Sequence, residues 1–394
     1  MTTATTRAVR AGLGADHEHG AVVPPLHLSS NFTFADFDQP RQYDYTRSGN
    51  PTRDALGDAL AELEHGAGGV ITSSGMAAIN LVCQLLRPGD LLIAPHDCYG
   101  GSYRLFDTLA ARGAFRVEFV DQTDEAALRA ALARKPRLVW VETPSNPLLR
   151  LVDIEAVCAV AHEHGALVAV DNTFLSPALQ TPLTLGADIV VHSTTKYLNG
   201  HSDVVGGAVV ARTEALHEDL AWWANCIGIT GAPFDSFLTL RGVRTLGARI
   251  RAHEENAIAV AKVLRKHPLV SVVNYPGLQS HPDHELACRQ QRGFGGMLSF
   301  ELRGGEEEVR CFLSSVKHFF VAESLGGVES LVCHPATMTH KPLTDAARAA
   351  AGISATLIRL SIGIESAGDL CEDVLQALDQ AVVATRHNPV VAVA

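Results

Sequence analysis

The feature that most constrains this chain is the alternation of short apolar runs with amphipathic stretches between residues 61 and 193. Each run has five or six residues and few polar side chains, which is typical of strands buried on both faces. Strands that alternate with helices form a parallel sheet covered by helices on both faces. The expected strands are 91–95, 116–120, 137–142, 166–171 and 188–193, and the expected helices between them lie in 100–113, 124–135 and 153–165.

Length and patterning divide the 394-residue chain into three parts. A single hydrophobic core rarely serves more than about 250–300 residues, so two packed domains are expected. Residues 1–60 show little periodicity and form an arm that must pack on something else to be ordered. Residues 61–255 are expected to form a large domain and residues 256–394 a smaller C-terminal α/β domain. A long helical stretch is expected from about residue 234 to residue 266.

Composition excludes several classes of function. The net charge is -11 and no run is rich in Lys or Arg, which argues against a nucleic-acid or anionic-membrane partner. No apolar stretch approaches the roughly 18 residues of a membrane span, and the N-terminal residues lack the apolar core of a signal peptide. The eight cysteines never occur as C-x-x-C, so neither a zinc site nor a disulfide framework is expected. These features predict a cytoplasmic protein without bound metal.

The residues that directly follow the expected strands are the first candidates for chemistry. Ligands of open α/β sheets bind beyond the carboxyl ends of the strands. Lys196 stands out there, because an ammonium group is costly to bury without a partner, whereas a half-buried lysine with a lowered pKa is a good nucleophile toward a carbonyl. The other candidates are Tyr99 after 91–95, Asn146 after 137–142, Asp171 at the end of 166–171 and Ser193 at the end of 188–193.

One common cofactor, pyridoxal 5'-phosphate (PLP), needs such a set of residues. A lysine holds it as a Schiff base, and its pyridine nitrogen needs an anionic partner to stay protonated. Its phosphate is well bound by backbone N–H groups at a helix N-terminus, assisted by hydroxyls. Lys196 and Asp171 meet the first two needs. The phosphate and ring candidates are Gly75 and Met76, which open a helical pattern, the hydroxyls of Ser193 and Thr195, and Tyr99, which could stack on the ring.

Each of these residues also has a simpler explanation. A lysine after a strand is usually a solvated loop residue, a strand-end aspartate is often a turn residue, and Ser-Ser-Gly before a helix is often only an N-cap. Their combination is what favours PLP. Other chemistries fit less well, because G-x-S-x-G and complete G-x-G-x-x-G motifs are absent from the sequence. The stretches "DHEHG" and "SHPDHE" are more typical of solvated loops than of metal sites, and Cys98 lacks a companion acid–base arrangement.

Longer motifs extend these observations over nearly the whole chain. They are "YTRSGNPTR", "APHDCYGGSYR", "ETPSNP", "VDNTF", "STTKYLNGHSDVVGG", "ESLGGVESL" and "IRLSIGIE". With these motifs the sequence resembles the Cys/Met-metabolism family of PLP-dependent enzymes. The resemblance implies an aspartate-aminotransferase-like fold (PLP fold type I), with a mostly parallel central sheet and a smaller C-terminal domain. It also implies a homotetramer built from two dimers with shared active sites, in which the arm contacts the neighbouring subunit.

The resemblance also implies roles for individual residues. Tyr45 and Arg47 should reach the PLP phosphate of the neighbouring subunit, and arginine suits that task because its planar fork pairs with phosphate at two points. Arg359 should clamp the substrate α-carboxylate in the same way. The remaining assignments are Asn146 to the cofactor ring oxygen and the substrate carboxylate, Ser324 to Lys196 or the substrate, Tyr99 to proton transfer, and Asp44, Ser48, Arg104 and Glu323 to the distal substrate pocket.

Within the family the stretches "APHDCYGGSYRLFD", "LAWWANCIGITG" and "ARAAAGIS" are most similar to the γ-synthases. Leu325 stands where β-lyases usually have tryptophan, so the sequence sides with the γ-enzymes, although γ-lyases share much of the same pattern. The implied reaction is γ-replacement of O-succinyl-L-homoserine, or O-acetyl-L-homoserine, by L-cysteine to give L-cystathionine for methionine biosynthesis. The alternative is the γ-elimination of a γ-lyase. Ser48 occupies a position where some γ-synthases have a second arginine, which leaves the acyl donor open. A non-catalytic scaffold with the same fold is a third hypothesis, which retention of Lys196, Asp171, Tyr99 and Arg359 argues against.

Overall fold

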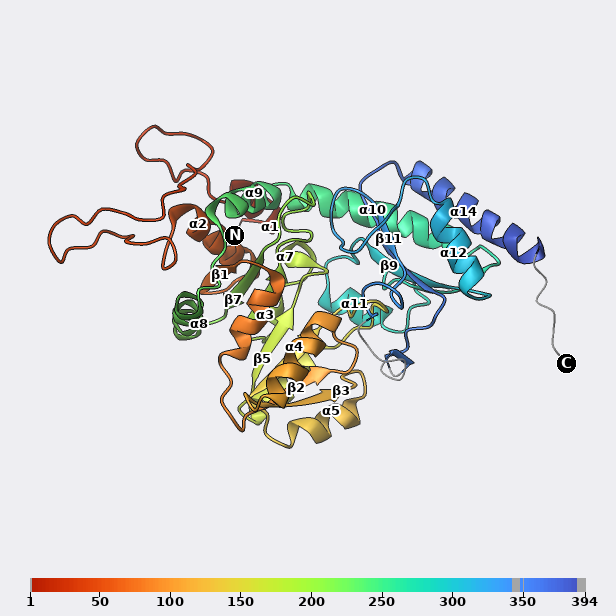
Figure 1. Ribbon diagram of the computed structural model, residues 1–394, viewed down its shortest axis with the longest axis horizontal. Coiled ribbons are helices and arrows are strands. Elements are labelled where there is room, and N and C mark those ends of the chain that lie inside the picture. The colour runs from red at the N-terminus through yellow and green to blue at the C-terminus, as the bar shows by residue number, and fades with distance from the viewer. Residues whose placement is uncertain (1, 342–347, 350, 388–394) are drawn as a thin grey trace. The chain divides into compact units, whose positions relative to one another are not determined.

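The structure is a computed structural model, and it describes residues 2–341, 348–349 and 351–387. The last seven residues of the expected C-terminal domain lie outside the described residues. The chain forms two compact units (Figure 1). The first unit contains the described residues up to 95 together with 101–143 and 152–247. The second unit contains 96–100, 144–151 and the described residues from 248 onward.

The first unit is built on a seven-stranded sheet with the order β1-β7-β6-β5-β4-β2-β3. The central strands β6, β5, β4, β2 and β3 pair in parallel, and β7 is antiparallel to both β1 and β6. The prediction of a mostly parallel α/β sheet is therefore confirmed. The strands are β1 Gly68–Thr72, β2 Leu91–Pro95, β3 Arg116–Val120, β4 Leu138–Glu142, β5 Leu167–Asp171, β6 Ile189–Ser193 and β7 Gly207–Ala211.

Helices cover this sheet and pack their apolar faces on it. Trp140 of the sheet and Phe106 of a covering helix pack edge to face in this core, with ring centroids 5.6 Å apart. Burial of such large apolar side chains is the main stabilising contribution to the unit. The helices are α1 Ala4–Arg10, α2 Pro51–Glu64, α3 Gly75–Cys83, α4 Gly100–Ala111, α5 Glu125–Leu132, α6 Ile154–Glu163, α7 Ser176–Leu179, the 3₁₀ turn η1 Pro182–Leu185, α8 Glu214–Ile227 and α9 Pro233–Val243.

Helix α2 begins inside the segment that the sequence presents as an unpatterned arm. The side chain of Asn50 accepts hydrogen bonds from the amides of Thr52 and Arg53, and Pro51 occupies the first helical position. Both features are typical of a helix start. Before it, residues 12–49 run as long loops that extend away from the sheet of their unit (Figure 1).

The long helical stretch expected over 234–266 is present but divided, because the chain forms α9 and then α10 (Leu246–Leu264). The amide and the hydroxyl of Thr245 both donate to the carbonyl of Gly242, at 3.1 Å each. These bonds span three residues instead of the four of an α-helix, so they close a tight turn and end α9. Helix α10 begins in the first unit and continues into the second.

The second unit contains a five-stranded, mostly antiparallel sheet with the order β10-β11-β12-β9-β8. Phe300 of this sheet packs edge to face on Phe312 of a covering helix, with ring centroids 5.5 Å apart. The elements are β8 Val270–Asn274, α11 His284–Gln290, β9 Met297–Leu302, α12 Glu306–Ser315, β10 Phe320–Val321, β11 Leu331–Cys333, β12 Leu357–Ser361 and α14 Ala367–His387. In the described part of the chain we find no helix with the length and apolar character of a membrane span.

Candidate active site

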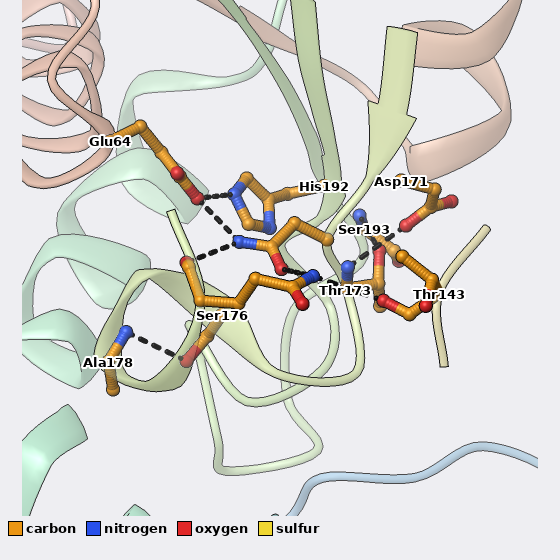
Figure 2. A network of polar contacts seen from close by, with 10 residues as sticks. Glu64, Thr143, Asp171, Thr173, Ser176, Ala178, His192 and Ser193 are labelled. Carbon is orange, nitrogen blue, oxygen red and sulfur yellow. Dashed lines mark hydrogen bonds and ion pairs between the residues drawn. The ribbon is translucent and has the colours of Figure 1, made fainter. Parts of the chain in front are cut away.

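Two of the predicted site residues are the last residues of the neighbouring strands β5 and β6. Asp171 is the last residue of β5 and Ser193 the last residue of β6, and these neighbouring strands run in parallel. Thr173 links them, because its amide donates to the Asp171 carboxylate at 2.9 Å and its hydroxyl accepts from the Ser193 amide at 2.9 Å (Figure 2). The two predicted residues therefore share one edge of the sheet, where α/β proteins bind ligands.

The electrostatic environment of Asp171 suits a cationic ligand. Burial raises the pKa of Asp171, because the surroundings solvate an ionised carboxylate poorly. The hydrogen bonds from Thr173 and the nearby His192 act in the opposite direction and lower that pKa. A protonated pyridine nitrogen beside this carboxylate would complete the compensation for its buried charge.

Helix α3 presents its N-terminus to Ser193. The Ser74 side chain caps the helix by accepting from the Ala77 amide at 3.0 Å. Gly75 is the first helical residue, and a Cβ atom at this position would lie only 2.7 Å from the Cβ of Ser193. Glycine thus allows the first turn of α3 and the Ser193 hydroxyl to approach closely. Backbone N–H groups and a hydroxyl at a helix N-terminus form a favourable environment for a phosphate. Met76 points instead into the core.

Lys196 lies half-buried in the turn that follows β6. The amide of Lys196 donates to the carbonyl of Ser193 at 3.2 Å, and the amide of Gly200 donates to the carbonyl of Lys196 at 2.8 Å. The Thr195 hydroxyl both donates to the Gly206 carbonyl (3.2 Å) and accepts from the Gly206 amide (3.1 Å). This arrangement braces the loop. The assignment of Thr195 to the phosphate stays a prediction, since its hydroxyl is already engaged.

The arm residues lie at the surface of the first unit. Tyr45 is 49% exposed, and the guanidinium of Arg47 lies 5.7 Å from the centre of its ring. Arg47 donates through Nη1 to both the backbone carbonyl and Oδ1 of Asn225, at 2.9 and 2.7 Å. Ser48 donates to the Asp44 carboxylate at 2.8 Å. Two predicted phosphate ligands are therefore exposed on their own chain. The predicted pocket residue Arg104 is also exposed, on α4.

The second unit holds a buried arginine with a ready-made set of acceptors. Arg359, in the middle of β12, is 3% exposed. Its Nη1 donates to Oδ1 of Asn146 at 3.0 Å, and its Nη2 donates to the carbonyl of Ser324 at 2.8 Å. Its buried Nε has no hydrogen-bond partner among the described residues. The remaining N–H donors of this guanidinium are suited to bind a carboxylate.

Three further predicted residues belong to the second unit. Ser324 has a φ of 98°, which is rare for a residue with a side chain and marks a constrained turn beside Arg359. Tyr99, 43% exposed, is grouped with this unit through residues 96–100. Glu323 is exposed. The structure thus brings Arg359, Asn146 and Ser324 together, and it brings Asp171, Ser193 and Gly75 together in the first unit.

Sequence reasoning missed polar residues behind these sites. His340 is 1% exposed, and burial, assisted by the nearby Arg359, lowers its pKa to about 4, so it is neutral beside that guanidinium at neutral pH. His192 and Glu64 form a fully buried hydrogen-bonded pair behind Asp171. The only signal for His192 was a polar residue within an otherwise apolar run. Glu64 had none, because "LAELEHG" reads as an ordinary exposed helix end.

A lysine, a buried carboxylate and a helix N-terminus faced by a hydroxyl fit PLP, and a buried arginine fits an α-carboxylate. Comparison with known proteins also indicates a PLP-dependent enzyme. The model of the family "Cys/Met metabolism PLP-dependent enzyme" matches residues 5–379. The chain belongs to this family and is a PLP-dependent enzyme.

Particular relatives narrow the comparison. The chain is 61% identical to cystathionine gamma-synthase of Escherichia coli over 93% of its own length and 96% of that protein. It is 47% identical to cystathionine gamma-lyase of Dictyostelium discoideum, over 95% and 97%. The crystal structure of cystathionine gamma synthase from Xanthomonas oryzae pv. oryzae in complex with aminoacrylate and cysteine matches with a TM-score of 0.97 at 62% identity, over 98% of this chain and 100% of that one. The fold prediction is thereby confirmed.

Proposed function

We propose that this enzyme catalyses γ-replacement, in which the thiol sulfur of L-cysteine displaces the acyloxy group from Cγ of O-succinyl- or O-acetyl-L-homoserine, giving L-cystathionine and free succinate or acetate. The observation that carries the proposal is the margin in similarity. Identity is 61–62% to cystathionine gamma-synthases of two organisms and 47% to a gamma-lyase, all over more than nine-tenths of the chain. A second structure of the Xanthomonas synthase, in complex with cystathionine, matches with a TM-score of 0.96.

In this proposal the first unit holds the cofactor, within the large domain expected from residue 61 to residue 255. PLP supplies an electron sink that stabilises charge at the substrate carbons. Lys196 would hold the cofactor through Nζ, and the same nitrogen would be the base that takes the proton from the substrate Cα. Asp171 holds the proton of the pyridine nitrogen. The backbone N–H groups of Gly75 and Met76 at the start of α3, with the hydroxyls of Ser193 and Thr195, bind the phosphate.

The second unit orients the amino-acid substrate. The Arg359 guanidinium binds the α-carboxylate, and its bonds to Asn146 and Ser324 prevent it from rotating. Such a pre-oriented fork loses little conformational freedom when substrate binds. The Tyr99 hydroxyl transfers protons to or from the incoming amine or thiol. Asp44, Ser48, Arg104 and Glu323 shape the pocket for the distal acyl group, and the acyl donor depends on them.

We further propose a homotetramer, a dimer of dimers in the cytoplasm, whose sites are shared between subunits. The arm supports this proposal, because several of its apolar side chains are exposed on a single chain. Phe37 is 94% exposed, Val22 70% and Leu28 66%. Such a surface favours a protein partner. In the dimer, Tyr45 and Arg47 reach the cofactor phosphate of the neighbouring subunit.

Product analysis tests the reaction. We expect O-succinyl-L-homoserine with saturating cysteine to give cystathionine, and we expect omission of cysteine to divert the reaction to 2-oxobutyrate and ammonia. The reason is that the acyloxy group leaves in both cases. The remaining four-carbon unit then reacts with a thiol if one is bound, and with water if none is. Mass spectrometry of products from both acyl donors makes the comparison. If 2-oxobutyrate dominates with cysteine present, or cystathionine is cleaved faster than it is made, the γ-lyase function replaces this one.

Subunit mixing tests the shared site. Arg47→Ala and Lys196→Ala subunits should each be nearly inactive alone, since one lacks a phosphate ligand and the other the cofactor lysine. In a mixed dimer, one site can combine the intact arm of one chain with the intact lysine of the other. We expect activity to return on mixing. Absence of recovery, with exchange confirmed by differently tagged subunits, would contradict a shared site.

A further inference from the structure

A buried carboxylate lies behind the cofactor edge of the first unit. Glu64 is the last residue of α2 and is fully buried, as are His192 and Asn172. Its Oε1 accepts from Nε2 of His192 at 2.7 Å and from Nδ2 of Asn172 at 2.8 Å. Figure 2 shows Glu64 pointing at His192 from a different part of the chain. One oxygen atom therefore joins α2 to two neighbouring strand ends.

Two of the three residues of this contact are chain neighbours of predicted cofactor ligands. Asn172 directly follows Asp171, and His192 directly precedes Ser193. Successive side chains of a strand point to opposite faces. The Asp171–Thr173–Ser193 contacts thus form one row on the cofactor side, and the Asn172–Glu64–His192 contacts form a second row behind it. The backbone connects the rows, because the Asn172 amide donates to the Val191 carbonyl at 2.9 Å.

The second row extends to a third strand end. Gln180 accepts from Asn172 Nδ2 through its carbonyl at 2.9 Å. Its own Nε2 donates to Asn172 Oδ1 and to the backbone carbonyl of Thr143, both at 3.1 Å. Thr143 directly follows β4. The Asn172 side chain is therefore held through both of its polar atoms, and the ends of β4, β5 and β6 are joined by one network.

Stability alone does not explain this arrangement. Removing polar groups from water is costly, and replacing a buried hydrogen-bonded pair by apolar residues of the same shape can be nearly neutral. Moreover, Oε2 of Glu64 and Nδ1 of His192 are buried and have no hydrogen-bond partner among the described residues. Each such atom costs free energy. Groups of this kind are better explained by the fixed geometry that their directional bonds impose.

We propose that Glu64, Asn172 and His192 are positioning residues that set the spacing between Asp171 and Ser193, and thereby the fit of the cofactor ring and phosphate. The proposal rests on PLP binding as given above and assigns to three residues a role in holding the site rather than in the reaction. Because the ligands of one cofactor lie on adjacent strands, a small change in strand spacing affects both at once.

The test compares two substitutions of Glu64 in the full-length holoenzyme. Glu64→Ala removes both contacts, and we expect PLP binding to weaken by about tenfold, as is common when the support of a ligand is removed, with a weaker circular-dichroism band of the bound cofactor. Glu64→Gln keeps an acceptor oxygen for both donors, so affinity should stay within about threefold. Asn172→Ala removes one contact and should fall between them, which provides a test if Glu64→Ala does not fold.

The matched control is Asp373→Asn in the second unit. Asp373 is also buried, and its carboxylate accepts from the amides of Lys317 and His318 at 2.8 and 2.7 Å. Its substitution should lower the melting temperature and leave PLP affinity unchanged. If Glu64→Ala changes PLP affinity no more than Asp373→Asn does, or if Glu64→Gln is as impaired as Glu64→Ala, the proposal is wrong.

Hydrogen exchange without added PLP separates this proposal from the proposed function. In Glu64→Ala, the amides of Thr173 and Ser193 should exchange about tenfold faster or more, because their spacing is no longer fixed, whereas Asp373→Asn should leave them unchanged. A wild-type protein that does not bind PLP would refute the proposed function and leave this measurement valid. Unchanged exchange at both amides would refute the positioning role.

Discussion

In the proposed function the two units each bind an anionic group, and they do so in different ways. In the first unit the polar groups lie where parallel strands end, since all carboxyl ends of a parallel sheet meet at one edge. Short residues such as Ser193 and Gly75 are sufficient there. The second sheet is mostly antiparallel and gathers no such edge, so a long side chain, Arg359, extends from mid-strand. In the first unit the sheet topology brings the candidate anion-binding groups together. In the second unit the length of the arginine side chain has this effect.

The units also differ in how charge depends on pH. In the first unit, burial raises the pKa of Asp171, so ionisation is unfavourable without a cationic partner. In the second unit, burial lowers the pKa of His340 and of His253, each to about 4, so protonation is unfavourable. The first unit therefore loses stability from Asp171 as the pH rises, and the second loses stability from its histidines as the pH falls.

Lys196→Ala should produce the largest change, because no other residue is assigned to bond the cofactor. We expect kcat/KM to fall by at least about 10³-fold, with loss of the visible absorption of bound PLP. Borohydride reduction followed by peptide mass spectrometry is the measurement, with the exposed Lys317→Ala as the matched lysine control. A PLP adduct that persists on another residue in Lys196→Ala would show the assignment to be wrong.

Arg359→Lys tests the second site and should leave the first intact. The ammonium keeps the charge and loses the fork that also binds Asn146 and Ser324, so we expect kcat/KM to fall by about 100-fold, as charge-assisted hydrogen bonds are worth about 1.5–3 kcal/mol. PLP affinity should not change. Steady-state kinetics and cofactor titration make the comparison, and the surface variant Arg303→Lys is the control. A large loss of PLP affinity would contradict the division of roles.

Acidification tests the opposite charge responses. The unfolded chain takes up a proton on His340 below pH 6.5, and the folded chain resists it until about pH 4. The unfolded state thus binds more protons in this window, and stability falls as the pH falls, by on the order of 2 kcal/mol at pH 5 for this residue. Denaturant unfolding at pH 7 and pH 5 should show a smaller difference for His340→Gln than for the wild type. Equal differences would contradict the assignment.

The smallest expected effect is on the protein without cofactor. Asp171→Asn removes a carboxylate whose pKa burial raises, so above its unfolded value near 3.8 the variant should be the more stable of the two. The melting temperature without PLP measures this at neutral pH. Added PLP should stabilise the wild type more than the variant, because only the wild type gains the ion pair. A variant that is less stable than the wild type without PLP would contradict the conclusion that ionised Asp171 destabilises the first unit.

Much of the first unit could be predicted from sequence, because continuous apolar runs leave few alternatives to buried strands. The five expected strands are present, each within a residue of the expected start. Strands β1 and β7 were missed, since "GGVIT" and "GAVVA" are short and contain glycine, which weakens a strand pattern. The break between Val243 and Leu246 was missed because it depends on two local hydrogen bonds and not on residue periodicity.

The positions of candidate site residues could be predicted where they follow an expected strand, and their roles stay predictions; residues whose surroundings depend on a distant partner could not be predicted. Lys196 and Asp171 could be found at strand ends. Glu64 could not, because a helix-end glutamate is usually exposed, and only the fold shows that it is buried against His192. His340 could not be predicted either, because its pKa is lowered by burial and by Arg359, which lies in a different segment of the chain. Pairing between distant segments is a property of tertiary structure.

The path of the chain has a consequence for recombination between relatives. The chain passes from one unit to the other after residues 95, 100, 143, 151 and 247. A chimera made by a single exchange after residue 247 would take Arg359 and Ser324 from the donor enzyme, yet it would keep the recipient's Tyr99 and Asn146. A graft of the complete second unit needs three exchanged pieces, 96–100, 144–151 and 248 onward. Libraries for new substrate specificity should therefore use five crossover points instead of one.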